Sequence, residues 1–149
     1  MTTIPIEKTN ALKAFREADE KGRALLTNLF GKEVLSDNVM DRIKTMDDVY
    51  AELGEEEFDK DGLTDDEIAY KEAKLIARAL NEGWFPDMTD GTTKYYPWMK
   101  YTPGVGWSYY DYEFSISDSS VGSRLLLKSS TLAKYAATQF PNVYNNLFS

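Results

Sequence analysis

The chain has 149 residues, with 17 Lys and Arg against 25 Asp and Glu for a net charge of −8, and it contains neither Cys nor His. This composition excludes disulfides, thiolate nucleophiles, imidazole bases and zinc sites built from Cys or His, so any chemistry must use carboxylates, Lys, Tyr or hydroxyls. The length suits one compact domain over residues 1–149, because a chain of this size can bury a substantial core.

The first residues have neither the basic segment nor the apolar stretch of a signal peptide. No apolar run approaches the ~20 residues that a membrane-spanning helix needs. We therefore expect a cytoplasmic protein with no membrane-spanning segment.

Four helices are expected in an acidic part over residues 1–83. Apolar positions at helical spacing predict the first over residues 7–30, ended by Gly31. A helix of one or two turns follows the polar cluster at residues 36–38, and another begins after Thr45 and ends at Gly54. The best-marked helix begins at Thr64, where Thr followed three residues later by Glu67 is typical of a capping box.

An aromatic part over residues 84–149 contains the predicted strands. Nine of the twenty residues from Tyr95 to Phe114 are aromatic, and residues 103–106 read as a hairpin connection. A third strand is predicted around residues 121–128, followed by a helix that Pro141 should kink or split. The order of elements predicts an α+β fold, in which N-terminal helices pack on a small three-stranded antiparallel sheet that a C-terminal helix completes.

Strand alternation indicates which rings of the hairpin face solvent. Strict alternation places Lys94 and Lys100 on one face of the first strand, and Asp111 and Glu113 on one face of the second, which marks these faces as the outer ones. The predicted outer surface consists of Tyr96, Trp98, Trp107 and Tyr109, with Lys94, Lys100, Arg124 and Lys128 at its edge. Exposed rings beside cations suit single-stranded nucleic acid, because bases stack on aromatic side chains while Lys and Arg bind phosphates. A sugar or a protein partner could use the same surface, and a helix could instead cover it.

The second candidate is an acidic segment, in which nine of the sixteen residues from Glu52 to Glu67 are Asp or Glu. Within it, residues 59–62 resemble part of a calcium-binding loop, but Ile68 stands where a bidentate Glu is required. The alternatives are a solvated connector and a weak divalent-cation site. A third use of the acidic helices, including residues 55–57, is contact with a basic protein partner.

Two further sets of residues could carry chemistry. Residues 119–125 place small residues before Arg124, an arrangement that suits an anion or simply a tight turn. Carboxylate-dependent hydrolysis would need a pair such as Asp87 and Asp90, or Asp111 and Glu113. Nothing in the pattern distinguishes these from surface carboxylates, so we assign no catalytic residue, metal or cofactor and favour a non-enzymatic protein.

Charge is divided unevenly between the two parts. Residues 1–90 carry a net charge of −10, whereas residues 91–149 carry +2. The acidic balance of the whole chain therefore does not describe the aromatic part, where the predicted binding surface lies.

Several short motifs together resemble an uncharacterised family of small bacterial and phage-associated proteins. They occupy residues 81–87, 95–98, 120–125, 128–129 and 132–135. The resemblance covers most of the chain from the first helix onward and is strongest after residue 67. It implies an accessory protein of unknown function, from a phage or mobile element, and brings no known activity, cofactor or catalytic residue.

Overall fold

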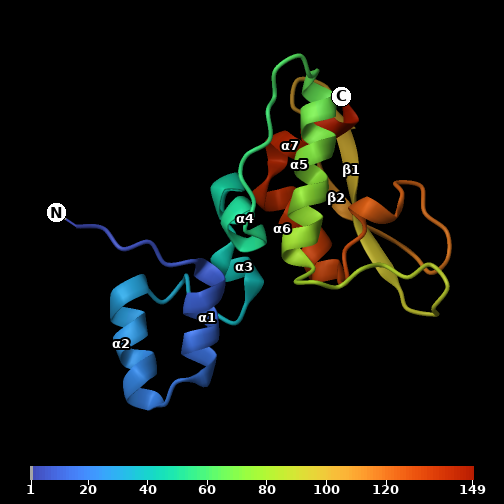
Figure 1. Cartoon of the computed structure of the whole chain (residues 1–149). Coiled ribbons are helices and arrows are strands. Elements are labelled where there is room, and N and C mark those ends of the chain that lie inside the picture. The colour runs from blue at the N-terminus through green and yellow to red at the C-terminus, as the bar shows by residue number, and fades with distance from the viewer. Residues whose placement is uncertain (1) are drawn as a thin grey trace. The chain divides into compact units, whose positions relative to one another are not determined.

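The computed structural model describes residues 2–149 and has an α+β fold (Figure 1). It divides into two compact units, of which the first ends at Glu57 and the second spans Phe58–Ser149. The helical and aromatic parts of the sequence meet at residue 83, but the helix before that position belongs to the second unit. None of the helices formed by residues 2–149 has the length and apolar character needed to cross a bilayer.

The first unit contains four helices, α1 Lys8–Glu17, α2 Glu20–Phe30, α3 Val39–Arg42 and α4 Met46–Leu53. The single long helix expected over residues 7–30 is therefore two helices. They part at Asp19, which is extended and caps α2 by accepting a hydrogen bond from the Gly22 backbone N–H at 2.8 Å. Gly22 also permits a close approach, since a Cβ there would lie 2.9 Å from that of Ala18. Asp19 thus begins a new helix at a point where the apolar spacing alone predicted that the first helix continues.

The caps of α3 and α4 agree with the sequence. Asn38 accepts a hydrogen bond from the Met40 backbone N–H at the start of α3, and Thr45 and Asp48 form a reciprocal capping box on α4. Gly54 then ends α4 in the left-handed conformation. These contacts join residues at most three positions apart, which explains why they could be predicted.

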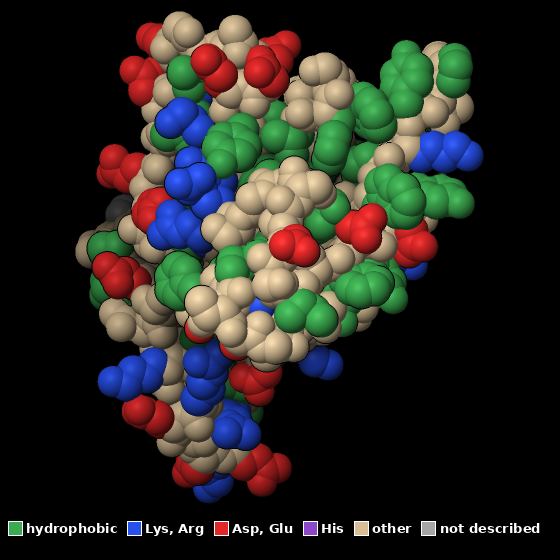
Figure 2. Space-filling view, turned by 90° about the vertical axis from the view of Figure 1, so that its right-hand side faces the viewer, with side chains coloured by type: hydrophobic (Ala, Val, Ile, Leu, Met, Phe, Trp, Pro, Cys, Tyr) green, Lys and Arg blue, Asp and Glu red, His purple; other side chains and the backbone are tan. Residues whose placement is uncertain are grey.

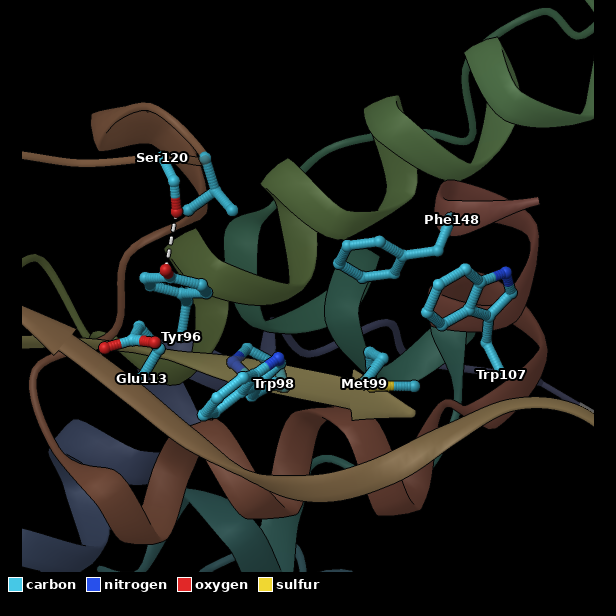
Figure 3. A pocket seen from close by; sticks show the side chains of 9 residues that line it. Tyr96, Trp98, Met99, Trp107, Glu113, Ser120 and Phe148 are labelled. Atoms are coloured by element: carbon cyan, nitrogen blue, oxygen red, sulfur yellow. Dashed lines mark hydrogen bonds between the residues drawn. The ribbon is translucent and has the colours of Figure 1, made fainter. Parts of the chain in front are cut away.

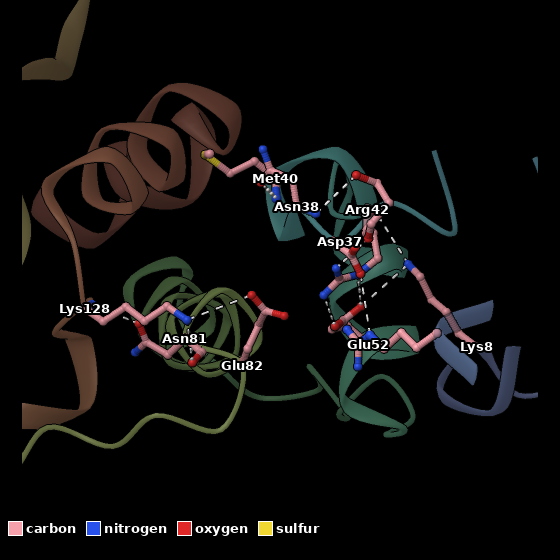
Figure 4. A network of polar contacts seen from close by, with 11 residues as sticks. Lys8, Asp37, Asn38, Met40, Arg42, Glu52, Asn81, Glu82 and Lys128 are labelled. Atoms are coloured by element: carbon pink, nitrogen blue, oxygen red, sulfur yellow. Dashed lines mark hydrogen bonds and ion pairs between the residues drawn. The ribbon is translucent and has the colours of Figure 1, made fainter. Parts of the chain in front are cut away.

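A buried ion pair joins α3 to α4 in the first unit (Figure 4). The Arg42 guanidinium donates to the two carboxylate oxygens of Glu52 at 2.7 and 3.3 Å, and to the Ser36 carbonyl at 2.8 Å. Its side chain is only 1% exposed. In the same unit, Ala11, Leu12 and Leu35 form a buried apolar cluster.

The second unit contains α5 Asp65–Leu80, the hairpin strands β1 Lys94–Thr102 and β2 Gly106–Ser115, a 3-10 turn η1 Ser123–Leu125, and the helices α6 Ser130–Gln139 and α7 Pro141–Phe148. Thr64 and Glu67 form the predicted capping box at the start of α5, and Pro141 divides the last helix as predicted. Within this unit, α6 packs on both strands and α7 on β2, while α5 packs on α6, α7 and η1. Within this unit it is thus the C-terminal helices α6 and α7 that pack on the hairpin strands. The sequence had predicted this packing for the acidic N-terminal helices, with the C-terminal helix completing the core.

The predicted third strand is absent from residues 2–149, and the sheet has two strands. Leu127 alone pairs with β1, through reciprocal backbone hydrogen bonds with Tyr95. Gly122 has a φ of 78°, and the 3-10 turn that follows breaks the extended chain before a ladder can form. All three leucines at residues 125–127 are buried, whereas a strand with one solvent-facing side would bury only alternate side chains.

An asparagine at the end of α5 binds the backbone on either side of Leu127 (Figure 4). Asn81 is 3% exposed, and its amide donates to the Leu126 carbonyl at 2.9 Å and accepts from the Lys128 backbone N–H at 3.0 Å. Leu127 turns its own N–H and C=O toward Tyr95 of β1, so these two groups of its neighbours point to the opposite edge of the segment, where the Asn81 side chain satisfies both.

Candidate binding site on the aromatic hairpin

The hairpin loop forms as predicted, and α7 fixes its second strand. The Asn145 side chain accepts a hydrogen bond from the Trp107 backbone N–H at 2.8 Å, and a Cβ on Gly106 would lie only 2.7 Å from that same oxygen. Gly106 also has a φ of 93°, in the left-handed region. The start of β2 is therefore held by a contact that only Gly accommodates.

A β-bulge divides the four predicted rings between the two faces of the hairpin. Trp98 lies opposite Asp111, but the next residue, Met99, lies opposite Tyr109, so Tyr110 has no partner across the ladder. Residues directly opposite each other share a face of the hairpin. The extra residue, Tyr110, therefore moves the side chains that precede it in β2 to the face opposite to the one that strict alternation predicts. Tyr96 and Trp98 share one face, as expected, whereas Trp107 and Tyr109 lie on the other face with Met99 and Tyr101.

Tyr110 takes a place that the sequence assigned to other rings. It stands edge-on to Trp98, with ring centroids 6.2 Å apart, and the Lys100 ammonium lies 5.4 Å from its centroid. Trp98 is 52% exposed and Tyr110 is 62% exposed. The solvent-facing cluster at the bulge therefore consists of Trp98, Lys100 and Tyr110. No local sequence signal marked the bulge.

The four predicted cations have different surroundings. Lys94 is 0% exposed, because its ammonium donates to Asp90 at 2.8 Å and to the Ile116 carbonyl at 2.7 Å, so it supports the hairpin rather than edging an outer surface. Lys128 contacts the Asn81 carbonyl and the Glu82 carboxylate. Lys100 and Arg124 are exposed, and neither forms an ion pair within residues 2–149.

The candidate catalytic carboxylates of the preceding loop are held ionised by local contacts. Asp87 and Asp90 each accept hydrogen bonds from the backbone and hydroxyl of the Thr two positions later. These contacts lower the pKa of Asp87, and the Lys94 ammonium together with Thr92 lowers the pKa of Asp90 to about 2. A general acid needs the opposite shift.

The pKa of Asp90 predicts acid sensitivity. Because its pKa is lower in the folded state than the ordinary value of 3.8, its contribution to stability is complete above about pH 4 and is lost as the pH falls toward about 2. We expect the urea midpoint to fall between pH 5 and pH 2.5, and to fall less in Asp90→Asn. The exposed Asp118→Asn is the control; an equal effect of both substitutions would contradict a specific role for Asp90.

A groove of about 440 Å³ lies beside β1 (Figure 3). Residues from both strands, from the segment after β2 and from the end of α7 line it: Tyr96, Pro97, Trp98, Met99, Trp107, Glu113, Ser120, Val121 and Phe148. In Figure 3, Tyr96, Glu113 and Ser120 lie toward one end and Trp107 and Phe148 toward the other, with Trp98 and Met99 between them. Three of the predicted rings therefore reach one groove despite the bulge.

Contacts between side chains shape the two ends of this groove. The Tyr96 and Ser120 hydroxyls are hydrogen-bonded at 2.5 Å, and the rings of Trp107 and Phe148 lie 5.6 Å apart. Tyr109 lies outside the groove, and burial raises the pKa of its phenol. Sequence reasoning missed Phe148 and Glu113 as groove residues, because α7 and the segment at Ser120 approach the hairpin only in the tertiary structure.

The acidic connector does not form a calcium-loop arrangement. The Asp59 carboxylate accepts a hydrogen bond from the Asp61 backbone N–H, and Lys60 pairs with Glu72 of α5. No three Asp or Glu side chains within residues 2–149 are grouped so as to hold a metal ion.

No family model, curated protein or solved structure matches the chain. The resemblance to a phage-associated family therefore stays a prediction, and the site must be judged from its own geometry.

Proposed function

We propose that this chain is a non-enzymatic binding protein whose aromatic hairpin contacts a protein partner. The observation that carries the proposal is the number of large apolar side chains that one hairpin exposes. Seven residues between 98 and 116 are at least two-fifths exposed: Trp98, Tyr101, Val105, Tyr110, Tyr112, Phe114 and Ile116. Figure 2 shows apolar side chains gathered close together on one face, with single charged groups among them.

Such a surface suits protein contact for two physical reasons. Exposed apolar patches mark interaction sites, and Trp, Tyr and Phe supply large, rigid contact area in the centres of interfaces. Two of the four predicted cations are not free at this surface, since Lys94 is buried and Lys128 pairs with Glu82, which leaves Lys100 and Arg124. Burial of the rings against a partner would supply most of the binding free energy.

The test is capture of a partner from the source cell by the full chain and by Tyr112→Ser/Phe114→Ser. Both side chains lie on one face of β2 and are exposed, so their loss should leave the fold intact and weaken capture at least tenfold. Leu25→Ser/Leu29→Ser on α2 is the matched control, because it also removes two exposed apolar side chains. Unchanged capture by the hairpin variant would contradict the proposal.

Single-stranded nucleic acid is a second candidate, favoured by one observation. Trp98 and Tyr110 offer exposed rings beside the Lys100 ammonium, which is the pairing that base stacking and phosphate contact need. Quenching of Trp fluorescence by a mixed-sequence oligonucleotide should then weaken with salt and be lost in Trp98→Ala. No quenching at low salt would exclude this candidate.

A further inference from the structure

We propose that the groove beside β1 binds an organic cation, an ammonium or guanidinium group, between its aromatic rings and Glu113. The proposal rests on the proposed function, since Trp98 belongs to both surfaces, and it names the chemistry that a partner or small ligand would present. Four rings line the groove, those of Tyr96, Trp98, Trp107 and Phe148. Aromatic rings attract cations through the negative face of the ring, and several rings together form the cages that bind quaternary ammonium groups.

Glu113 supplies the charge that selects a cation. It lies opposite Tyr96 on the same face of the hairpin and is half-buried in the groove wall. Its carboxylate forms no hydrogen bond or ion pair with any of residues 2–149. A half-buried carboxylate without a partner gains when a ligand brings a positive charge to it.

The rest of the groove lining disfavours an anionic ligand. No Lys or Arg lines the groove, so a phosphate or carboxylate would meet Glu113 with no compensating cation. The volume, about 440 Å³, is within the range of small-ligand sites and would hold a trimethylammonium or guanidinium group with its stem. The hydroxyl pair of Tyr96 and Ser120 adds hydrogen-bonding capacity near Glu113.

Choline, acetyl-arginine-amide and 3,3-dimethyl-1-butanol, the uncharged isostere of choline, are the probes. Each is titrated into the full chain at constant ionic strength while Trp fluorescence is recorded. We expect saturable binding of at least one cation and at least tenfold weaker binding of the isostere. Choline and the arginine derivative distinguish a quaternary ammonium from a guanidinium as the preferred group. Equal binding of cation and isostere, or no saturable binding of either cation, would overturn the proposal.

Two matched variants test the role of the carboxylate. Glu113→Gln keeps the size of the side chain and should weaken cation binding about tenfold or more, because a charge-assisted contact is lost. Asp111→Asn removes a carboxylate two residues away on the same strand, outside the groove lining, and should leave the affinity unchanged. Equal loss in both variants would contradict a specific role for Glu113. Partner capture that depends on Tyr112 and Phe114 while neither choline nor acetyl-arginine-amide binds would reject the cation site and leave the proposed function standing.

Discussion

Replacing Glu52 by alanine is expected to lower the free energy of unfolding by about 3–5 kcal/mol, the cost of removing the carboxylate that pairs with a buried guanidinium. The Arg42 guanidinium is 1% exposed and makes its 2.7 Å contact with Glu52. Ser36 offers one carbonyl to Arg42, which satisfies a donor but does not neutralise the charge. Lys8 approaches Glu52 at 3.9 Å, too far to contribute as much as Arg42.

The measurement is urea denaturation followed by far-UV circular dichroism, which reports the helices of the whole chain, including α3 and α4. The double variant Arg42→Met/Glu52→Leu is the control, because replacing both charges with apolar side chains of similar size is often neutral or stabilising. A loss below about 1 kcal/mol in Glu52→Ala would mean that water reaches the guanidinium, as at an exposed ion pair.

Asn81→Ala is expected to cost about 2–4 kcal/mol, because each buried polar group left unsatisfied costs about 1–3 kcal/mol. The substitution removes the donor to the Leu126 carbonyl and the acceptor for the Lys128 backbone N–H. Leu126 is buried, so water cannot replace the lost donor without opening the core. The backbone of Asn81 is helical and accepts Ala without strain, so the whole effect belongs to the side chain.

Trp fluorescence follows this second prediction, because all three Trp residues lie in the second unit, at positions 84, 98 and 107. Asn146→Ala on α7 is the control, since this exposed Asn should change stability by no more than about 0.5 kcal/mol. Hydrogen exchange at the Lys128 amide should speed up in Asn81→Ala and stay unchanged in the control. Similar denaturation midpoints for the two variants would show that the Asn81 contacts are not needed.

The exposure of the hairpin side chains could be predicted only in part from the sequence. Strand alternation predicted that Trp98 and Lys100 are exposed on the same face, and the structure confirms this. The prediction that Trp107 and Tyr109 share the face of Tyr96 and Trp98 was wrong. One unpaired residue, Tyr110, reverses the alternation of side chains along β2. The prediction that Lys94 lies at the edge of an exposed surface was also wrong, because its ammonium pairs with Asp90, four residues earlier, and is buried.

The sequence by itself determined the features that depend on neighbours a few residues away. The capping boxes at Thr45 and Thr64 and the division of the last helix at Pro141 are of this kind, since local hydrogen bonds and backbone restriction decide them. Only the tertiary structure decided that the Asn81 side chain would bind the backbone of residues 126 and 128, and that Phe148 would line one end of the groove. Asn81 meets Leu126 across 45 residues of chain, and contacts of such separation depend on how whole elements pack.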